Sequence, residues 1–239
     1  MQFEEFINQT EKKLNIKIKN FQKEQLIIYF SFLVENNKKI NLYSFDDQEL
    51  WLKYFYHSIF VYWKTNFNDC KTCLDLGSGS GTPGIILKIL YPHLCLTIVE
   101  ANHKKTNFIS CLVKKLKLTN VKILTSRIEE IKPNHDNQFD LVTARAVAPL
   151  EQLLELTIPY AKHHGLVILP KSKNYLKEVT NLSKEINILG GQLIFNDMQL
   201  DHAQTFITLY IKKVKKTPSI YPRKYSQIVK GFNYGNNSK

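Results

Sequence analysis

Four glycines follow closely on a short apolar run, and this segment constrains the fold more than any other. The run Leu74-Asp75-Leu76 leads into glycines at positions 77, 79, 81 and 84, and Pro83 precedes the last of them. Glycine lets a chain turn sharply and lie against a ligand, and proline suits the first turn of a helix. Free N–H groups at the start of such a helix can bind an anion. The segment therefore predicts a strand, a tight binding turn and a helix.

Downstream of Lys71, short apolar runs alternate with amphipathic stretches, which is typical of an α/β domain. We expect strands at 72–76, 95–100, 121–125, 139–143 and 165–169. A helix is expected at 104–118, between the second and third strands. Two later runs, 192–195 and 205–211, are candidate antiparallel neighbours that close the sheet.

The first 69 residues are predicted to form a helical cap. Apolar residues such as Phe21, Ile28 and Phe32 recur there at helical spacing. Asp46 or Asp47 can cap a further helix, whose buried face comes from the apolar stretch 50–63. We therefore expect a cap at 1–69 packed on a main domain at 70–211, followed by a tail at 212–239.

The chain carries a large excess of positive charge. Lysine and arginine number 33 against 21 aspartate and glutamate residues, a formal net charge of +12. The tail has eight basic residues and no acidic one: Lys212, Lys213, Lys215, Lys216, Arg223, Lys224, Lys230 and Lys239. We predict that this tail contacts the phosphates of a polyanion. The alternative is a generally lysine-rich composition with a solvated tail.

Other features limit the location and the chemistry. No apolar run approaches the roughly 18 residues of a membrane span, and the first residues lack the apolar core of a signal peptide, so we expect a cytoplasmic protein with no membrane partner. Cys70 and Cys73 have the spacing of a redox pair or half a zinc site, but no second pair completes four ligands. Cys73 and Cys95 lie in apolar runs and are expected to be small buried hydrophobes, so no metal is predicted.

The glycine series fits two classes of nucleoside cofactor. Gly79-x-Gly81-x-x-Gly84 satisfies the dinucleotide fingerprint, with Glu100 at the end of the next strand to hold a ribose hydroxyl. The series begins at Gly77, however, directly after an acidic strand end, and so looks like the loop of S-adenosylmethionine-dependent methyltransferases. Both cofactors carry a ribose diol, so Glu100 supports nucleoside binding without choosing between them.

Several motifs in the same order make a closer match. They are Gly77-Ser-Gly-Ser-Gly-Thr-Pro-Gly84, Ser126-Arg127-Ile128-Glu129-Glu130, Thr143-Ala-Arg-Ala-Val-Ala-Pro-Leu150, Asn41-Leu42 and the tail segment Thr217-Pro-Ser-Ile-Tyr-Pro-Arg-Lys224. Over almost its whole length the chain resembles the bacterial small-subunit ribosomal RNA methyltransferase G family, also called glucose-inhibited division protein B. The resemblance implies a Rossmann-like class I methyltransferase fold with an N-terminal helical cap. It also implies methyl transfer from S-adenosylmethionine to N7 of a guanosine in 16S ribosomal RNA.

The resemblance also assigns residues by position. The cofactor-binding set is Gly77, Gly79, Thr82, Glu100, Ile128, Glu129 and Arg145, with Ile128 and Glu129 at the adenine end. The candidate RNA contacts are Lys104, Lys105, Lys171, Arg223 and Lys224. The sequence departs from the family where Tyr54 stands for a usual His, His57 for a usual Asp, and Thr82 for a bulkier apolar residue.

Methylation at guanine N7 needs no general base, because N7 has a free lone pair and no proton to lose. No catalytic residue is therefore assigned, and the expected catalysis is by orientation and electrostatics. Duplex RNA hides N7 in its deep major groove, so the target should be an unpaired or extruded base, on which one of Tyr54, Phe55 and Tyr56 could stack. We expect a monomer acting on 16S RNA within the small subunit or an assembly intermediate. The alternatives are a degenerate methyltransferase fold that only binds RNA or assists ribosome assembly, and a nucleotide-linked oxidoreductase.

Overall fold

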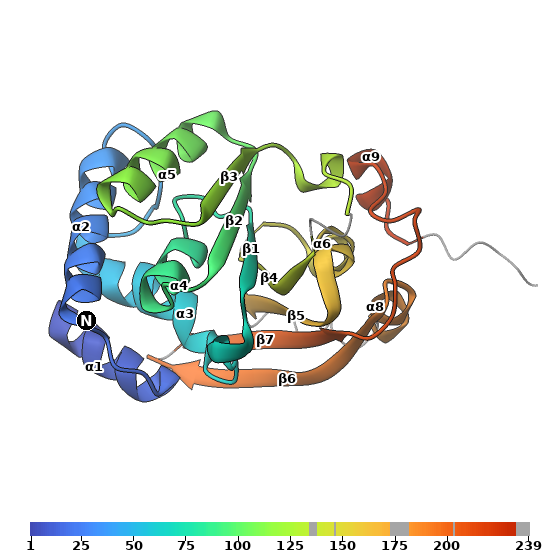
Figure 1. Cartoon of the computed structure of the whole chain (residues 1–239), viewed down its shortest axis with the longest axis horizontal. Helices are drawn as coiled ribbons and strands as arrows, with labels where there is room; N and C mark the ends of the chain where they lie inside the picture. Colours follow the sequence, from blue (N-terminus) through green and yellow to red (C-terminus); the bar gives the residue numbers. More distant parts are fainter. Residues whose placement is uncertain (134–137, 146, 173–181, 203, 233–239) are drawn as a thin grey trace, which may run out of the picture. The chain divides into compact units, whose positions relative to one another are not determined.

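The computed structural model describes residues 1–133, 138–145, 147–172, 182–202 and 204–232 (Figure 1). Ala146 of the predicted motif and residues 233–239 of the predicted tail therefore lie outside the described residues. The chain divides into two compact units, Met1–Ser126 and Arg127–Lys239. Within the described ranges, no helix combines the length and the apolar character that crossing a membrane requires.

The first unit begins with two long helices, α1 (Phe3–Leu14) and α2 (Asn20–Asn37). The buried face of α2 consists of Gln22, Leu26, Tyr29 and Leu33. The expected face was partly wrong, because Phe21 is 48% exposed. Helix α2 packs against α4 and α5 of the same unit, where the Gln22 amide donates to the Ile89 carbonyl at 2.6 Å (Figure 1).

The predicted helix at 50–63 is helical, but its geometry changes along its length. A 3₁₀ turn, Asp47–Glu49, is capped by the Asp46 carboxylate, which accepts the Gln48 N–H at 2.8 Å. The segment then runs as π-helix Leu50–Tyr56, α3 (His57–Ile59) and 3₁₀ turn Phe60–Tyr62, and a further 3₁₀ turn covers Phe67–Asp69. Tyr54, Phe55 and Tyr56 are all buried, so the expectation that one of them stacks on a base was wrong.

Three parallel strands form the sheet of the first unit, in the order β3-β2-β1. They are β1 (Thr72–Leu76), β2 (Cys95–Glu100) and β3 (Val121–Thr125), which confirms the predicted runs. Helices α4 (Gly84–Leu90) and α5 (His103–Lys115) connect them. Cys95 is exposed, so its expected burial was wrong; it lies at the very start of β2, where the strand has only just entered the sheet.

The second unit has the strand order β4-β5-β7-β6. Strand β4 (Phe139–Ala144) is parallel to β5 (Ala161–Ser172), whereas β7 (Gln204–Lys213) is antiparallel to both β5 and β6 (Gly191–Asp201). The two late runs are thus antiparallel neighbours, as predicted. Among the described residues of this unit, the helical elements are 3₁₀ turn Ile128–Glu130, α6 (Leu150–Thr157), 3₁₀ turn Ile158–Tyr160, α8 (Ser183–Ile188) and α9 (Tyr225–Ile228).

The start of the predicted basic tail is partly buried in this unit. Lys213 ends β7 and is only 3% exposed. Its ammonium donates to the Leu189 carbonyl at 2.9 Å, to the Ile158 carbonyl at 3.2 Å and to the Thr217 hydroxyl. The expectation that Lys213 contacts phosphates was therefore wrong, because this side chain satisfies backbone carbonyls inside the protein.

Burial also gives Lys213 a role in the pH dependence of stability. Desolvation lowers the pKa of Lys213 from 10.5 to about 8. The folded chain therefore binds fewer protons than the unfolded chain between these values, and the free energy of unfolding rises with pH across that window. From about pH 7.5 to about pH 9.5 the rise should be about 2 kcal/mol, and Lys213→Met should abolish it. Urea unfolding at both pH values measures this change. An equal rise in the free energy of unfolding in the wild type and in Lys213→Met would contradict the prediction.

Candidate cofactor-binding site

The glycine loop after β1 has left-handed backbone at Gly77, Gly79 and Gly81, with φ of +64°, +62° and +106°. At Gly81 a Cβ would lie 2.8 Å from the Tyr29 hydroxyl oxygen, so close packing excludes a side chain. At Gly79 a Cβ would meet no atom within 4 Å, so the strain of a positive φ alone opposes a side chain there. The loop is therefore packed on one side and open at Gly79, where a ligand can approach the backbone.

Asp75 organises the inside of this loop. Its carboxylate is fully buried and accepts the Gly84 N–H at 2.8 Å as well as the Ser78 hydroxyl. The sequence predicted that the N-terminus of the helix after the loop could bind an anion. In the structure, the first N–H of α4, at Gly84, already donates to the Asp75 carboxylate of the chain itself. A phosphate group beside Asp75 would be repelled by this carboxylate, which disfavours a pyrophosphate cofactor and suits a nucleoside without one.

Glu100 lies at the open side of the loop. One carboxylate oxygen accepts the Gly79 N–H at 3.0 Å, and the other accepts the Asn102 N–H at 2.9 Å. A carboxylate has about four acceptor positions, so lone pairs remain for the hydroxyls of a ribose. The structure therefore brings Glu100 together with Gly77 and Gly79 at the carboxyl ends of β1 and β2, where the Gly77 N–H donates to the Val99 carbonyl at 2.7 Å. Thr82 lies in the same loop but is only 7% exposed, and its role in cofactor binding stays a prediction.

Two tyrosines hold the far side of the loop, and sequence reasoning missed their role. The Tyr29 hydroxyl donates to the Ser80 carbonyl at 2.7 Å, and the Tyr54 hydroxyl donates to the Ser80 hydroxyl at 2.5 Å. Tyr54, one of the departures from the family pattern, is therefore a loop support. His57, another departure, is 5% exposed and packs beside the Phe60 ring, which places it in the core and not on an open surface.

The remaining predicted cofactor residues belong to the second unit. Ile128 is buried in the turn Ile128–Glu130, whose Glu129 carboxylate lies 3.9 Å from the Arg127 guanidinium. The Tyr160 hydroxyl lies 2.7 Å from the carbonyls of both Ile128 and Ile131 and shares its proton between them. Burial raises the pKa of Tyr160, which keeps the hydroxyl protonated as a donor.

Arg145 follows directly on the carboxyl end of β4. The loop after it is tied down by Lys171, whose ammonium donates to the Ala148 carbonyl at 2.6 Å. The roles of Ile128, Glu129 and Arg145 in cofactor binding stay predictions.

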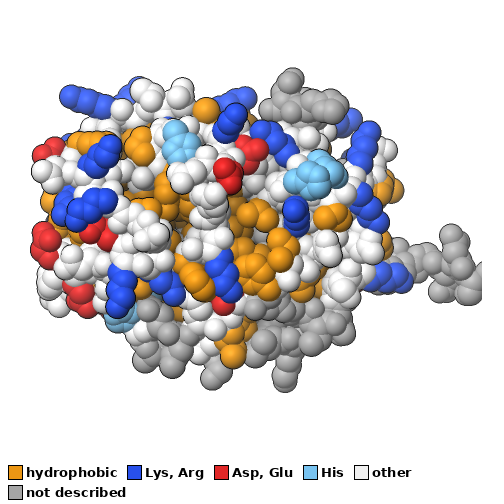
Figure 2. All heavy atoms as spheres, turned by 60° about the horizontal axis from the view of Figure 1, so that its bottom comes forward, with side chains coloured by type: hydrophobic (Ala, Val, Ile, Leu, Met, Phe, Trp, Pro, Cys, Tyr) orange, Lys and Arg blue, Asp and Glu red, His pale blue; other side chains and the backbone are white. Residues whose placement is uncertain are grey.

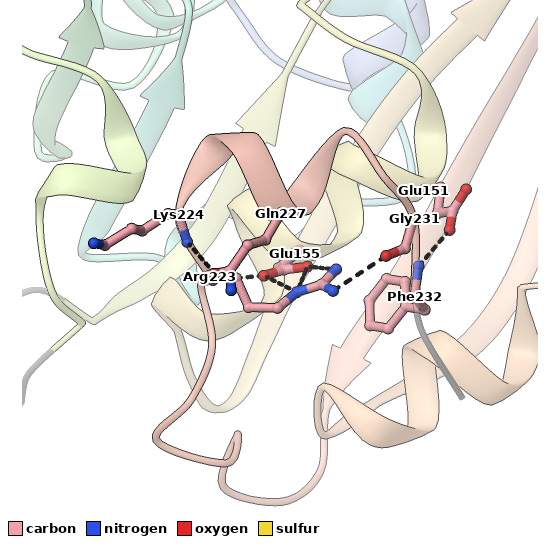
Figure 3. A network of polar contacts seen from close by, with 7 residues as sticks. All are labelled: Glu151, Glu155, Arg223, Lys224, Gln227, Gly231 and Phe232. Atoms are coloured by element: carbon pink, nitrogen blue, oxygen red, sulfur yellow. Dashed lines mark hydrogen bonds and ion pairs between the residues drawn. The ribbon is translucent and has the colours of Figure 1, made fainter. Parts of the chain in front are cut away.

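The predicted RNA contacts differ in how they are presented. Lys104 lies exposed in the first turn of α5 next to the half-buried Lys105, and Lys224 is also exposed. The Arg223 guanidinium instead bonds the buried Glu155 carboxylate at 2.6 Å, which gives it a partner inside the chain (Figure 3). Figure 2 shows Lys and Arg side chains spread over one face of the molecule and not gathered into a single patch. Across the described residues, His, Cys, Asp and Glu form no group of three or more that could hold a metal ion.

Comparison with known proteins agrees with this geometry. A family model described as rRNA small subunit methyltransferase G matches residues 22–206. The ribosomal RNA small subunit methyltransferase G of Mycoplasma capricolum is 38% identical over 231 residues, covering 94% of this chain and 96% of its own. The protein of the same name from Malacoplasma penetrans is 42% identical over 217 residues, covering 88% and 90%.

Solved structures support the fold. A putative O-methyltransferase from Klebsiella pneumoniae has a TM-score of 0.56 at 13% identity, over 78% of this chain and 90% of its own. A ribosomal protein L11 methylase from Lactobacillus delbrueckii has a TM-score of 0.51 at 16% identity, over 74% and 83%. These likenesses confirm the predicted Rossmann-like methyltransferase fold.

Proposed function

This chain belongs to the rRNA small subunit methyltransferase G family, and from that premise we propose that it transfers a methyl group from S-adenosylmethionine to N7 of a guanosine in 16S ribosomal RNA. The observation that carries this proposal is the open glycine loop with Glu100 held at its edge by the Gly79 N–H. The buried Asp75 behind the loop suits a nucleoside cofactor that has no pyrophosphate. A nucleotide-linked oxidoreductase and a degenerate RNA-binding protein are therefore not favoured.

In this proposal the chain binds and orients, and moves no proton. Glu100 accepts the ribose hydroxyls, and the backbone from Gly77 to Thr82 lies along the nucleoside. Ile128 and Glu129 contact the adenine end. When bound, S-adenosylmethionine supplies the electrophilic methyl group. Arg145 reaches the cofactor pocket, and a donor such as Arg145 or Lys171 can hold guanine O6 while the N7 lone pair stays free to react. Orientation and exclusion of water are then the main contributions of the protein.

Lysines next to this site are proposed to contact RNA phosphates. Lys104 and Lys105 lie in the first turn of α5, a few residues after Glu100, and the stretch 101–126 contains no acidic residue. Further exposed lysines continue along the same helix and into β3: Lys114, Lys115, Lys117 and Lys122. Such a series of exposed lysines, in a stretch without acidic residues, suits contact with a phosphate backbone. We propose that the protein acts as a cytoplasmic monomer on 16S RNA in the small subunit or an assembly intermediate.

The proposal predicts methyl transfer to a single guanine. The pure protein, incubated with labelled S-adenosylmethionine and small subunits from a strain that lacks this enzyme, should place label at N7 of one guanosine in 16S RNA. Subunits from a strain that has the enzyme are the control and should take up almost no label. Label at another atom, or none although calorimetry detects cofactor binding, would overturn the proposed reaction. Tight binding of NAD without binding of S-adenosylmethionine would instead support the oxidoreductase.

A further inference from the structure

The segment 221–232, called here the C-terminal clasp, is fastened to helix α6 at two points (Figure 3). Glu155 accepts the backbone N–H of Arg223 at 2.6 Å and its guanidinium Nη2 at 2.6 Å. One helical turn earlier, Glu151 accepts the Phe232 N–H at 2.9 Å. Arg223 also donates to the Gly231 carbonyl at 3.1 Å, so it links the two ends of the clasp.

This attachment is stronger than a surface ion pair. Glu155 is fully buried, and its two oxygens receive the guanidinium Nε at 3.1 and 3.0 Å as well as Nη2. Charge-assisted forks of this kind are both directional and strong, and removing one partner leaves a buried charge without compensation. The clasp therefore has a defined position in the second unit, and Arg223 makes the charge-assisted part of its attachment.

The clasp carries one aromatic ring to the turn proposed for the cofactor. Tyr225 begins α9, two residues after Arg223, and Ile228 in the same short helix is 1% exposed and anchors it. The Tyr225 ring centroid lies 5.1 Å from the Arg127 guanidinium carbon, a cation–π contact. Arg127 immediately precedes the turn Ile128–Glu130, and its N–H donates to the Glu130 carboxylate at 3.3 Å.

The turn is thus supported from two sides. The buried Tyr160 hydroxyl binds its carbonyls from the inside, whereas Tyr225 holds Arg127 from the outside. The Arg127 side chain is 56% exposed, so the rest of the protein holds it only in part. Removal of the Tyr225 ring would therefore leave the guanidinium more freedom to move. A loss of order at Arg127 would reach Ile128 and Glu129 directly through the backbone.

We propose that the C-terminal clasp positions the turn Ile128–Glu130 for the adenine end of the cofactor, with Arg223 and Tyr225 as positioning residues. This inference rests on the proposed function, which assigns Ile128 and Glu129 to S-adenosylmethionine. Arg223 acts by docking the clasp, and Tyr225 acts through Arg127. The arginine that the sequence suggested for RNA contact thereby supports cofactor binding from within the protein.

The test is the affinity for S-adenosylmethionine measured by calorimetry without RNA. Tyr225→Ala should raise the Kd about threefold to fivefold, as expected for an exposed cation–π contact. Tyr225→Phe keeps the ring and should stay within about twofold of wild type. Arg223→Ala should raise the Kd about tenfold, and Arg223→Lys should restore part of the affinity. Ser226→Ala, an exposed neighbour in α9, is the matched control and should leave the Kd unchanged.

A double variant separates positioning from general destabilisation. If Arg223 acts by placing Tyr225, adding Tyr225→Ala to Arg223→Ala should change the Kd no further. In the methyl-transfer assay the variants should raise the KM for S-adenosylmethionine while kcat at saturating cofactor stays near wild type. An unchanged Kd in folded Tyr225→Ala, or additive losses in the double variant, would overturn the proposal. Wild-type protein that binds no S-adenosylmethionine would overturn the proposed function itself, and this inference with it.

Discussion

Glu100→Ala is expected to weaken S-adenosylmethionine binding by about two to three orders of magnitude. The carboxylate is proposed to accept two ribose hydroxyls, and hydrogen bonds to a charged group contribute about 1.5–3 kcal/mol each. A loss of about 3–4 kcal/mol corresponds to that change in Kd. The variant also removes the acceptor of the Gly79 N–H, so the open side of the loop loses its fixed position. Calorimetry of the purified variant measures the effect.

Two further variants make this result specific. Glu100→Gln keeps one acceptor oxygen without the charge and should lose only about tenfold in affinity. Glu24→Ala removes an exposed carboxylate on α2 and should leave the Kd at the wild-type value. A Glu100→Ala protein that binds within about threefold of wild type would remove Glu100 from the cofactor site.

Asp75→Ala is expected to lower the free energy of unfolding by about 3 kcal/mol and to abolish cofactor binding. The substitution leaves the Gly84 N–H and the Ser78 hydroxyl without their acceptor, and each such buried donor costs about 1–3 kcal/mol. The glycine loop would then lose the contact that joins its two ends. Urea unfolding, together with calorimetry on the folded protein, measures both effects.

The neighbouring donors supply the controls for Asp75. Ser78→Ala removes one donor and leaves the Gly84 bond in place, so it should cost only about 1 kcal/mol. Asp75→Asn keeps an acceptor oxygen and should fall between the two. If Asp75→Ala proves as stable as Ser78→Ala, the carboxylate does not organise the loop.

The strands could be predicted because their signal is local. The runs at β1 and β2 are short, mainly apolar sequences, and burial in a parallel sheet requires little else. The run at β3 is an edge strand with no fully buried residue, and its apolar residues, which alternate with polar ones only in part, were the signal there. The glycine loop was predictable for the same reason, since left-handed backbone at Gly79 and Gly81 demands glycine wherever it occurs. The helical segment after Asp46 was recognised, but its change to π-helix at Leu50–Tyr56 was not, because apolar residues buried all round carry no single helical period.

The partners of polar side chains could not be predicted in this way. Lys213 and Arg223 have the same charge in the sequence as an exposed tail lysine, yet both are tied to groups inside the second unit. Arg223 and Glu155 are 68 residues apart, and no local pattern connects them. Tyr54 likewise meets Ser80 only because helix and loop pack together within the first unit.

The sequence by itself determined the order of strands and helices along the chain, the glycine loop, the acidic residue at the end of β2 and the family. Each of these depends on residue types and short spacings, which are visible in the sequence itself. Only the tertiary structure decided that Asp75 occupies the helix N-terminus, that Tyr29 and Tyr54 hold the loop, and that Arg223 fastens the C-terminal clasp to Glu155. The physical reason is that a charge or hydroxyl can be satisfied equally well by water or by a distant group, and packing alone chooses between them.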